Sequence, residues 1–198
     1  MLYQILRLIG KPIIYLLFLP KIIGKKNTRH KGRAIIISNH ISMWDPLFIA
    51  VVFRRQIFWM GKIELFKNKL ARIFFYAVKA FPVRRGEGDL AAIRHAFKIL
   101  RSGKLFGIFP EGTRGSGGEV APFRAGLHFL ARQRPDVDLV PVKLHNLGRI
   151  MPKGEFAPVP QLSRVTFGEP LRLEPRESKD AFLERARQAL VSLDPESP

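Results

Sequence analysis

The stretch Arg33-Ala34-Ile35-Ile36-Ile37-Ser38-Asn39-His40 is a short β-branched run that leads directly into a histidine. A run of this kind is typical of a buried strand. His40 then stands at the carboxyl end of the strand, and in open α/β sheets this edge is where ligands bind. The stretch therefore indicates an α/β fold with a functional residue at the edge of its sheet.

Asp45 follows His40 by five residues and immediately precedes Pro46. If a helix begins near Ser42 or Asp45, the carboxylate returns to the side of the imidazole and accepts a hydrogen bond from one ring nitrogen. The other ring nitrogen is then left as a base. The alternative is that Asp45 only caps a helix in which Pro46 takes the first position.

A second motif, Phe109-Pro110-Glu111-Gly112-Thr113-Arg114, follows another expected strand at residues 104–109. Pro110 cannot donate to a sheet ladder, so the strand ends there and a turn begins. The sequence leaves two interpretations of this turn. It is either a ligand site or a β-turn with a solvated ion pair.

The side chains of the second motif suit an anionic ligand. Gly112 allows close approach to the backbone, Thr113 offers a hydroxyl and an amide, and Arg114 offers a planar guanidinium suited to a phosphate. Glu111 either holds that guanidinium in place or faces the reacting group. These residue types together favour a phosphate-bearing substrate.

The two motifs together resemble those of the glycerolipid acyltransferases, most closely the bacterial 1-acyl-sn-glycerol-3-phosphate acyltransferases. Further segments occur in the family's order. They are Ala80-Phe81-Pro82-Val83-Arg84-Arg85, Phe123-Arg124-Ala125-Gly126 and Leu139-Val140-Pro141-Val142. The resemblance extends from Ile22 to Pro170, and Arg84 departs from it because the family commonly has Asp at that place.

The resemblance extends the reasoning from the residues to a reaction. His40 is expected to take the proton from the free hydroxyl of lysophosphatidic acid as that oxygen attacks an acyl thioester, and Asp45 to orient the imidazole. The product is phosphatidic acid. The alternatives are a related acyltransferase acting on glycerol 3-phosphate or another lysolipid, and a non-catalytic basic protein that binds lipid or nucleic acid.

The same resemblance assigns the binding residues and the donor. Arg85, Arg114 and Arg124 are expected to hold the acceptor phosphate, and the amides of Gly112 or Thr113 to bind that phosphate or the oxyanion. The acyl donor is acyl-CoA or an acyl-carrier protein. No bound cofactor is expected, and no metal, because the histidines show no metal-ligand spacing.

Alternation of strand and helix patterns predicts one α/β domain with a mixed β-sheet flanked by helices. We divide the chain of 198 residues into an apolar membrane-associating segment, residues 1–19, and an acyltransferase domain, residues 20–198. The zero cysteine content excludes a thiolate nucleophile. Helices are expected over residues 62–79, 89–101 and 123–133 and after residue 178, with Asp89 and Ser178 as caps of the second and the last. Strands are expected over residues 139–144 and 164–167.

The net charge of +18 indicates an anionic partner. Nucleic acid is the alternative, since a strongly basic chain suits phosphate backbones. Against it, the chain has no nucleic-acid recognition motif, and the charge is densest beside an apolar N-terminus. An anionic membrane surface is therefore the expected partner. The basic residues before Asp45 are Arg7, Lys11, Lys21, Lys25, Lys26, Arg29, Lys31 and Arg33.

Apolar residues dominate the segment from Leu2 to Ile23, but charged residues and prolines interrupt them. A membrane-spanning helix needs about 20 predominantly apolar residues. The pattern therefore predicts an interfacial helix, which places the protein on the cytoplasmic face of the cytoplasmic membrane as a peripheral or monotopic protein. The alternative is a helix packed on the protein core.

Overall fold

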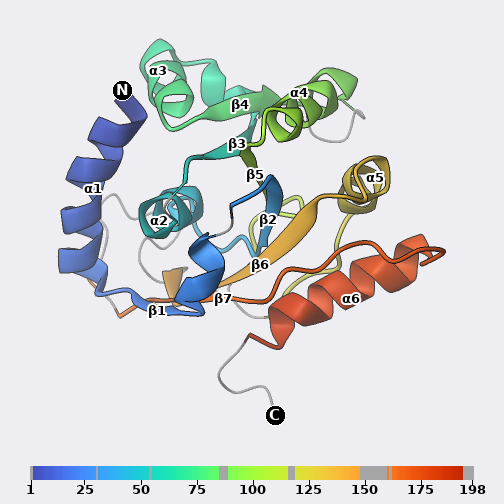
Figure 1. The fold of residues 1–198 in the computed structure, drawn as a ribbon. Helices are drawn as coiled ribbons and strands as arrows, with labels where there is room; N and C mark the ends of the chain where they lie inside the picture. The colour runs from blue at the N-terminus through green and yellow to red at the C-terminus, as the bar shows by residue number, and fades with distance from the viewer. Residues whose placement is uncertain are drawn as a thin grey trace.

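The computed structural model describes residues 2–29, 31–53, 55–84, 89–115, 119–147, 160 and 162–193. Seven strands form one sheet with helices on both of its faces (Figure 1). The strands are β1 (Lys21–Ile23), β2 (Ala34–Ser38), β3 (Ile57–Lys62), β4 (Ala80–Val83), β5 (Leu105–Ile108), β6 (Asp138–His145) and β7 (Arg164–Phe167). The helices are α1 (Leu2–Phe18), α2 (Asp45–Val52), α3 (Lys69–Ala77), α4 (Leu90–Arg101), α5 (Gly126–Gln133), α6 (Lys179–Val191) and the 3-10 turns η1 (Lys25–Arg29) and η2 (Ile63–Phe66).

The strand order is β1-β7-β6-β2-β5-β3-β4. Every neighbouring pair is parallel except β6 with β7, which confirms the mixed sheet. Strand β2 lies between β5 and β6, with Ile37 opposite both Ile108 and Pro141. The carboxyl ends of these three strands therefore meet at one edge, as the sequence predicts for the His40 and Glu111 motifs.

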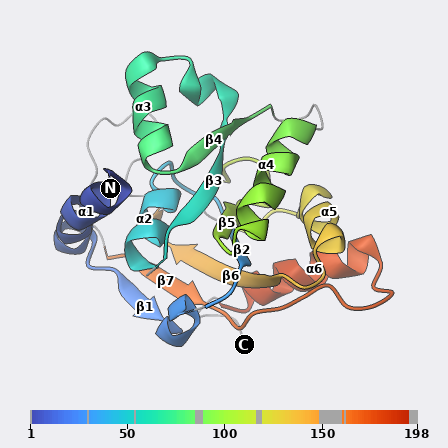
Figure 2. The same cartoon turned by 45° about the horizontal axis from the view of Figure 1, so that its top comes forward.

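The core has two layers, one on each face of the sheet, and β2 contributes to both. Ala34 and Ile36 pack with α1, α2 and the residues around η2, whereas Ile35 and Ile37 pack with α4, α5 and α6. Figure 2 shows the two groups of helices on opposite sides of the strands. All five residues of β2 are buried, because a central parallel strand is covered on both faces.

Two of the expected helices have the caps that the sequence indicates. The Asp89 side chain accepts a hydrogen bond from the Ala92 N–H at the start of α4, and Ser178 accepts one from Ala181 at the start of α6. The helix expected over residues 123–133 begins later, at Gly126. Residues 123–125 stay outside the helix, and the Arg124 N–H donates to the Pro110 carbonyl oxygen instead of a helical partner.

The prediction of one continuous helix over residues 62–79 is wrong. The segment is divided into η2 and α3, and Asn68 stands between them. The Asn68 side chain accepts hydrogen bonds from the N–H groups of Leu70 and Ala71, which starts a new helix. A short polar side chain that binds nearby backbone competes with helix continuation, and here that local bond decides the boundary.

Helix α1 runs through Pro12 and ends at Phe18. Its inner face carries the buried residues Tyr3, Ile14 and Phe18, so this helix does pack on the core. Its outer face is nonetheless apolar, with Leu8 76% and Leu16 79% exposed. In the described part of the chain, no helix is both long enough and apolar enough to cross a bilayer.

Gly107→Ala should destabilise the protein. A Cβ at Gly107 would lie 2.5 Å from Cε3 of Trp59, whose indole covers this point of β5. Overpacking in a core typically costs about 1–3 kcal/mol, so the free energy of unfolding should fall by that amount in chemical denaturation. Gly126→Ala is the control, because nothing lies within 4 Å of its added Cβ. Equal stability of both variants would show that Trp59 does not cover Gly107 in solution.

Candidate active site

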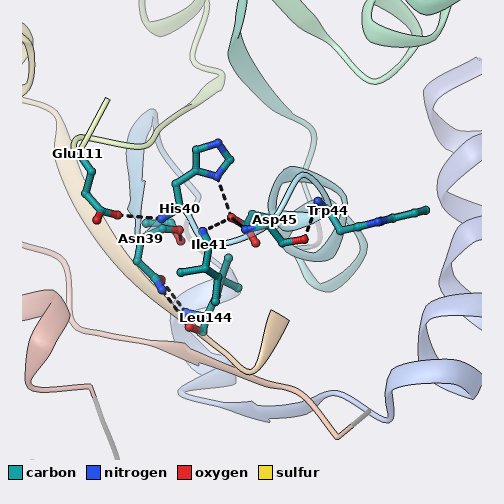
Figure 3. A network of polar contacts seen from close by, with 9 residues as sticks. Asn39, His40, Ile41, Trp44, Asp45, Glu111 and Leu144 are labelled. Atoms are coloured by element: carbon teal, nitrogen blue, oxygen red, sulfur yellow. Dashed lines mark hydrogen bonds and ion pairs between the residues drawn. The ribbon is translucent and has the colours of Figure 1, made fainter. Parts of the chain in front are cut away.

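His40 and Asp45 lie side by side in the loop between β2 and α2 (Figure 3). The distance between His40 Nδ1 and Asp45 Oδ2 is 2.8 Å. The same carboxylate oxygen accepts hydrogen bonds from the backbone N–H groups of Ile41, at 2.7 Å, and Ser42, at 2.9 Å. Three donors on one oxygen fix the carboxylate, and the carboxylate fixes the ring with Nδ1 as its donor.

The interpretation of Asp45 as a helix cap alone is wrong. Asp45 is the first residue of α2, and the residue in the cap position, Trp44, makes no side-chain cap hydrogen bond. The carboxylate instead points back to the loop that carries His40. The sequence is therefore right that the five-residue spacing brings the two side chains together.

Asp45 is fully buried, whereas 12% of the His40 side chain is exposed. Burial raises the pKa of the Asp45 carboxyl, and the hydrogen bonds from His40, Ser42 and Ile41 oppose that rise. A buried carboxylate is stabilised most by a positive charge in contact with it. A positive charge on the His40 ring would therefore be stabilised by its contact with Asp45.

Glu111 joins the second motif to the first. It is buried at the end of β5, and its Oε1 accepts a hydrogen bond from the His40 N–H at 2.8 Å. Its Oε2 accepts one from the Ala121 N–H at 3.0 Å. The Gly115 N–H donates to the His40 carbonyl oxygen at 2.8 Å, so both polar groups of the His40 backbone bind the turn that follows β5. The carboxylate of Glu111 therefore accepts hydrogen bonds from backbone N–H groups and does not hold the Arg114 guanidinium in place.

Gly112 and Arg124 pack against each other. Gly112 has a φ of +77°, and a Cβ there would lie 2.4 Å from Arg124 Nε. That Nε donates to the Glu111 carbonyl oxygen at 3.0 Å, and the Gly112 N–H donates to the Phe109 carbonyl oxygen. The structure therefore gives Gly112 a conformational role and leaves its amide engaged within the turn.

Three aromatic rings form a stack beneath the site. The His40 and Phe109 rings lie 4.1 Å apart with a 16° angle between their planes, and Phe109 lies 5.1 Å from Trp59 with a 15° angle. Asp45 meets the edge of the imidazole and Phe109 meets its face. The ring is therefore restrained in two directions.

Asn39 ties the site to the neighbouring strand. Its side-chain amide donates to the Leu144 carbonyl oxygen at 2.9 Å and accepts from the Leu144 N–H at 2.8 Å. These bonds continue the pairing of β2 with β6 after the ladder ends at Ser38. Because Asn39 directly precedes His40, they fix the position from which the histidine projects.

The remaining predicted residues differ in their placement. Thr113, Arg114 and Arg124 are exposed near the Glu111 turn, where an anion can reach them. Arg84, at the carboxyl end of β4, is exposed on the same edge of the sheet, whereas Arg85 lies outside the described residues. Within the described ranges no group of three or more His, Asp, Glu or Cys side chains could hold a metal ion.

Sequence reasoning missed the positioning residues. Trp59 carried no motif signal, and Phe109, although it is the first residue of the second motif, was given no role of its own. The backbone contacts of Glu111 depend on the register of β2 with β5, which no local pattern gives. Asn39 was the one positioning residue that the sequence could have indicated, because it directly precedes His40 in the first motif.

These features define a three-layer α/β enzyme domain whose histidine and buried aspartate lie at the carboxyl ends of parallel strands. The family model described as Acyltransferase matches residues 20–145. The chain belongs to this acyltransferase family, which confirms the resemblance that the two motifs indicate.

Known relatives carry a more specific name. The chain is 29% identical over 184 residues to the 1-acyl-sn-glycerol-3-phosphate acyltransferase of Bacillus subtilis. This match covers 88% of this chain and 87% of that protein. It is 32% identical over 125 residues to the enzyme of the same name from Borreliella burgdorferi, and this match covers 62% of the chain and half of that protein.

A solved structure has the same fold. The crystal structure of the 1-acyl-sn-glycerophosphate acyltransferase PlsC from Thermotoga maritima matches with a TM-score of 0.77. The match covers 96% of this chain and 77% of that chain, at 21% sequence identity. At this identity the likeness shows the shared fold alone.

Glu111→Gln should lower kcat and stability while changing the acceptor KM little. Glutamine offers one acceptor oxygen, so one of the two buried N–H groups would face an amide donor, which costs about 1–3 kcal/mol. The loop would shift His40, and we expect a roughly tenfold or larger loss in kcat. Steady-state kinetics and thermal unfolding measure both effects.

The control for this variant is Glu119→Gln, which makes the same change of charge at an exposed position nearby. It should leave kcat and stability unchanged. A rise in the acceptor KM of Glu111→Gln with kcat intact would assign Glu111 to substrate contact instead.

Proposed function

We propose that this protein transfers a fatty acyl group from an acyl thioester to the free hydroxyl of 1-acyl-sn-glycerol 3-phosphate, giving phosphatidic acid. The observation that carries this proposal is the His40–Asp45 pair, in which Nδ1 is occupied by a buried carboxylate and Nε2 lies on the opposite side of the ring. The names of the Bacillus subtilis and Borreliella burgdorferi relatives support the choice of acceptor.

His40 acts as the general base in this reaction. Its Nε2 takes the proton of the acceptor hydroxyl as that oxygen attacks the thioester carbonyl carbon. The new ester C–O bond forms, the C–S bond breaks, and the leaving thiolate takes up the proton that His40 held. A thioester is already activated, so no acyl-enzyme is required. Asp45 keeps the ring oriented and offsets the imidazolium charge.

The acceptor phosphate binds to guanidinium groups around the Glu111 turn. Arg114 and Arg124 are exposed there, and the stem of Arg124 is held against Gly112 by its bond to the Glu111 carbonyl oxygen. Thr113 adds a hydroxyl beside them. Arg85 is proposed as a third phosphate ligand. In the sequence it comes two residues after the carboxyl end of β4, and this end lies on the same edge of the sheet as His40.

The enzyme acts at an anionic membrane surface on the cytoplasmic side. The exposed apolar face of α1, with Leu8 and Leu16, supports this proposal, as do the basic residues that follow it in the sequence. Either acyl-CoA or an acyl-carrier protein serves as donor, because both are anionic and the basic surface suits either. No bound cofactor takes part.

His40→Ala should abolish nearly all turnover, and Asp45→Asn should lower kcat by roughly 10³–10⁴-fold. The first removes the base, and the second keeps the shape but removes the negative charge that orients the ring. His95→Ala on α4 is the control, since that side chain is exposed on the other face of the sheet. Substantial turnover by His40→Ala would exclude the proposed base.

The assay for these variants also tests the substrate. Purified protein is offered lysophosphatidic acid, glycerol 3-phosphate or lysophosphatidylcholine, each with matched acyl-CoA and acyl-carrier-protein donors, and the products are identified by mass. Phosphatidic acid should be the main product. Preference for another acceptor would assign the protein to a related acyltransferase, and no turnover with any pair would favour a non-catalytic binding protein.

Arg114→Lys should lower kcat/KM for the acceptor by about tenfold or more, although it keeps the charge. An ammonium group cannot make the two parallel hydrogen bonds of a guanidinium to phosphate. Initial rates at varied acceptor and fixed donor measure the effect, with the exposed Arg94→Lys of α4 as control. A change confined to the donor's kinetics would show that Arg114 does not bind the acceptor phosphate.

A further inference from the structure

The segment formed by η2 and α3 presents an apolar face to solvent. Leu70 is 78% exposed and Ile73 55%, and both lie on the same face of α3 as Phe74. Leu65 and Tyr76 are exposed beside them. The spacing of Leu70, Ile73 and Phe74 is that of one helical face, and large apolar side chains rarely gather on a surface without a partner.

The opposite face of this segment is anchored in the core, so the exposed face is held in a defined position. Phe66 is buried, and its ring lies 5.4 Å from that of Phe75. Ala77 is also buried, and Asn68 caps the helix. These contacts hold α3 in place while the other half of its apolar residues stays in solvent.

Helix α3 lies on the same side of the sheet as α1. Phe66 and Phe75 belong to the same core layer as Ile14 and Phe18 of α1. Figures 1 and 2 both show these two helices on the side of the sheet away from α5 and α6. Of the sixteen exposed large apolar side chains in the described part of the chain, eleven lie on α1, at Leu19 or Leu65, or on α3. The exposed apolar surface is thus concentrated on one side.

Basic residues lie next to the apolar face of α3 at the start of the helix. Residues 62–79 contain five lysines and arginines and a single acidic residue, Glu64, which pairs with Lys62 at 3.3 Å. Lys67, Lys69 and Arg72 are exposed at the same end of α3 as Leu70. Apolar side chains bordered by positive charge fit the boundary between the acyl chains and the anionic headgroups of a bilayer.

We infer that α3 is a second membrane-contact element, which inserts Leu70, Ile73 and Phe74 into an anionic bilayer alongside the outer face of α1. This inference rests on the membrane attachment proposed for α1. Two separated contacts fix the orientation of the domain, whereas one helix alone leaves it free to tilt. The His40 ring stacks on Phe109, which packs against this same core layer, so the active site and the two helices lie on one side of the sheet.

The test uses the cysteine-free chain, in which a single introduced cysteine carries an environment-sensitive fluorophore. Leu70→Cys and Ile73→Cys report on α3, Leu8→Cys on α1, and Leu90→Cys, exposed on α4, is the matched control. With phosphatidylglycerol-containing vesicles, the labels at residues 8, 70 and 73 should shift to the blue and brighten, and the label at residue 90 should not. The unlabelled double variant Leu70→Ser/Ile73→Ser should bind these vesicles about tenfold more weakly.

The outcomes separate this inference from the attachment of α1. A shift at residue 8 with none at residues 70 and 73 would overturn the role of α3 and leave the attachment through α1 intact. No shift at any of the three would overturn both. The label at residue 70 could also shift without vesicles, which would overturn the membrane role of this face. A shift that grows with protein concentration would assign the face to a second copy of the chain. A shift caused by added acyl-carrier protein would assign it to a protein partner.

Discussion

The backbone of His40 is held from both sides, and the geometry of the site depends on that constraint. Its N–H donates to the buried Glu111 carboxylate and its carbonyl oxygen accepts from the Gly115 N–H, so loops that follow two neighbouring strands are joined at one residue. The same carboxylate binds the Ala121 N–H, which positions the chain that leads to Arg124. Arg124 is held separately, because its Nε donates to the main-chain carbonyl oxygen of Glu111. Loss of the Glu111 carboxylate would therefore displace His40 more than the basic residues proposed to bind the acceptor.

The sequence predicts those parts of the structure that local chemistry decides. The β-branched run of β2, the caps Asp89 and Ser178 and the His40–Asp45 pair each depend on residues a few positions apart. The break at Asn68 was also local, but the apolar stripe around it concealed the cap. The late start of α5 and the backbone contacts of Glu111 depend on strands and loops that meet across the sheet, and Trp59 meets Phe109 only because β3 pairs with β5. Such contacts cannot be found before the strand order is known.

The two faces of the sheet differ in composition and therefore in role. On one face, α4, α5 and α6 cover the strands. On the other, α1 and α3 pack their inner faces on the core and keep apolar residues on the outside, among lysines and arginines. The His40 stack lies on this second face. One arrangement of helices thus provides both the support for the ring and the surface through which a lipid would arrive.

The aromatic stack has a consequence for the order of events in the proposed reaction. His40 Nδ1 is committed to Asp45, and Phe109 covers one face of the ring, so the imidazole cannot turn to present its other nitrogen. One atom, Nε2, must then both receive the acceptor's proton and return it to the departing thiol. The two substrates have to be bound together when the acyl group moves. This favours a sequential kinetic scheme through a ternary complex, with intersecting rather than parallel lines in a double-reciprocal plot.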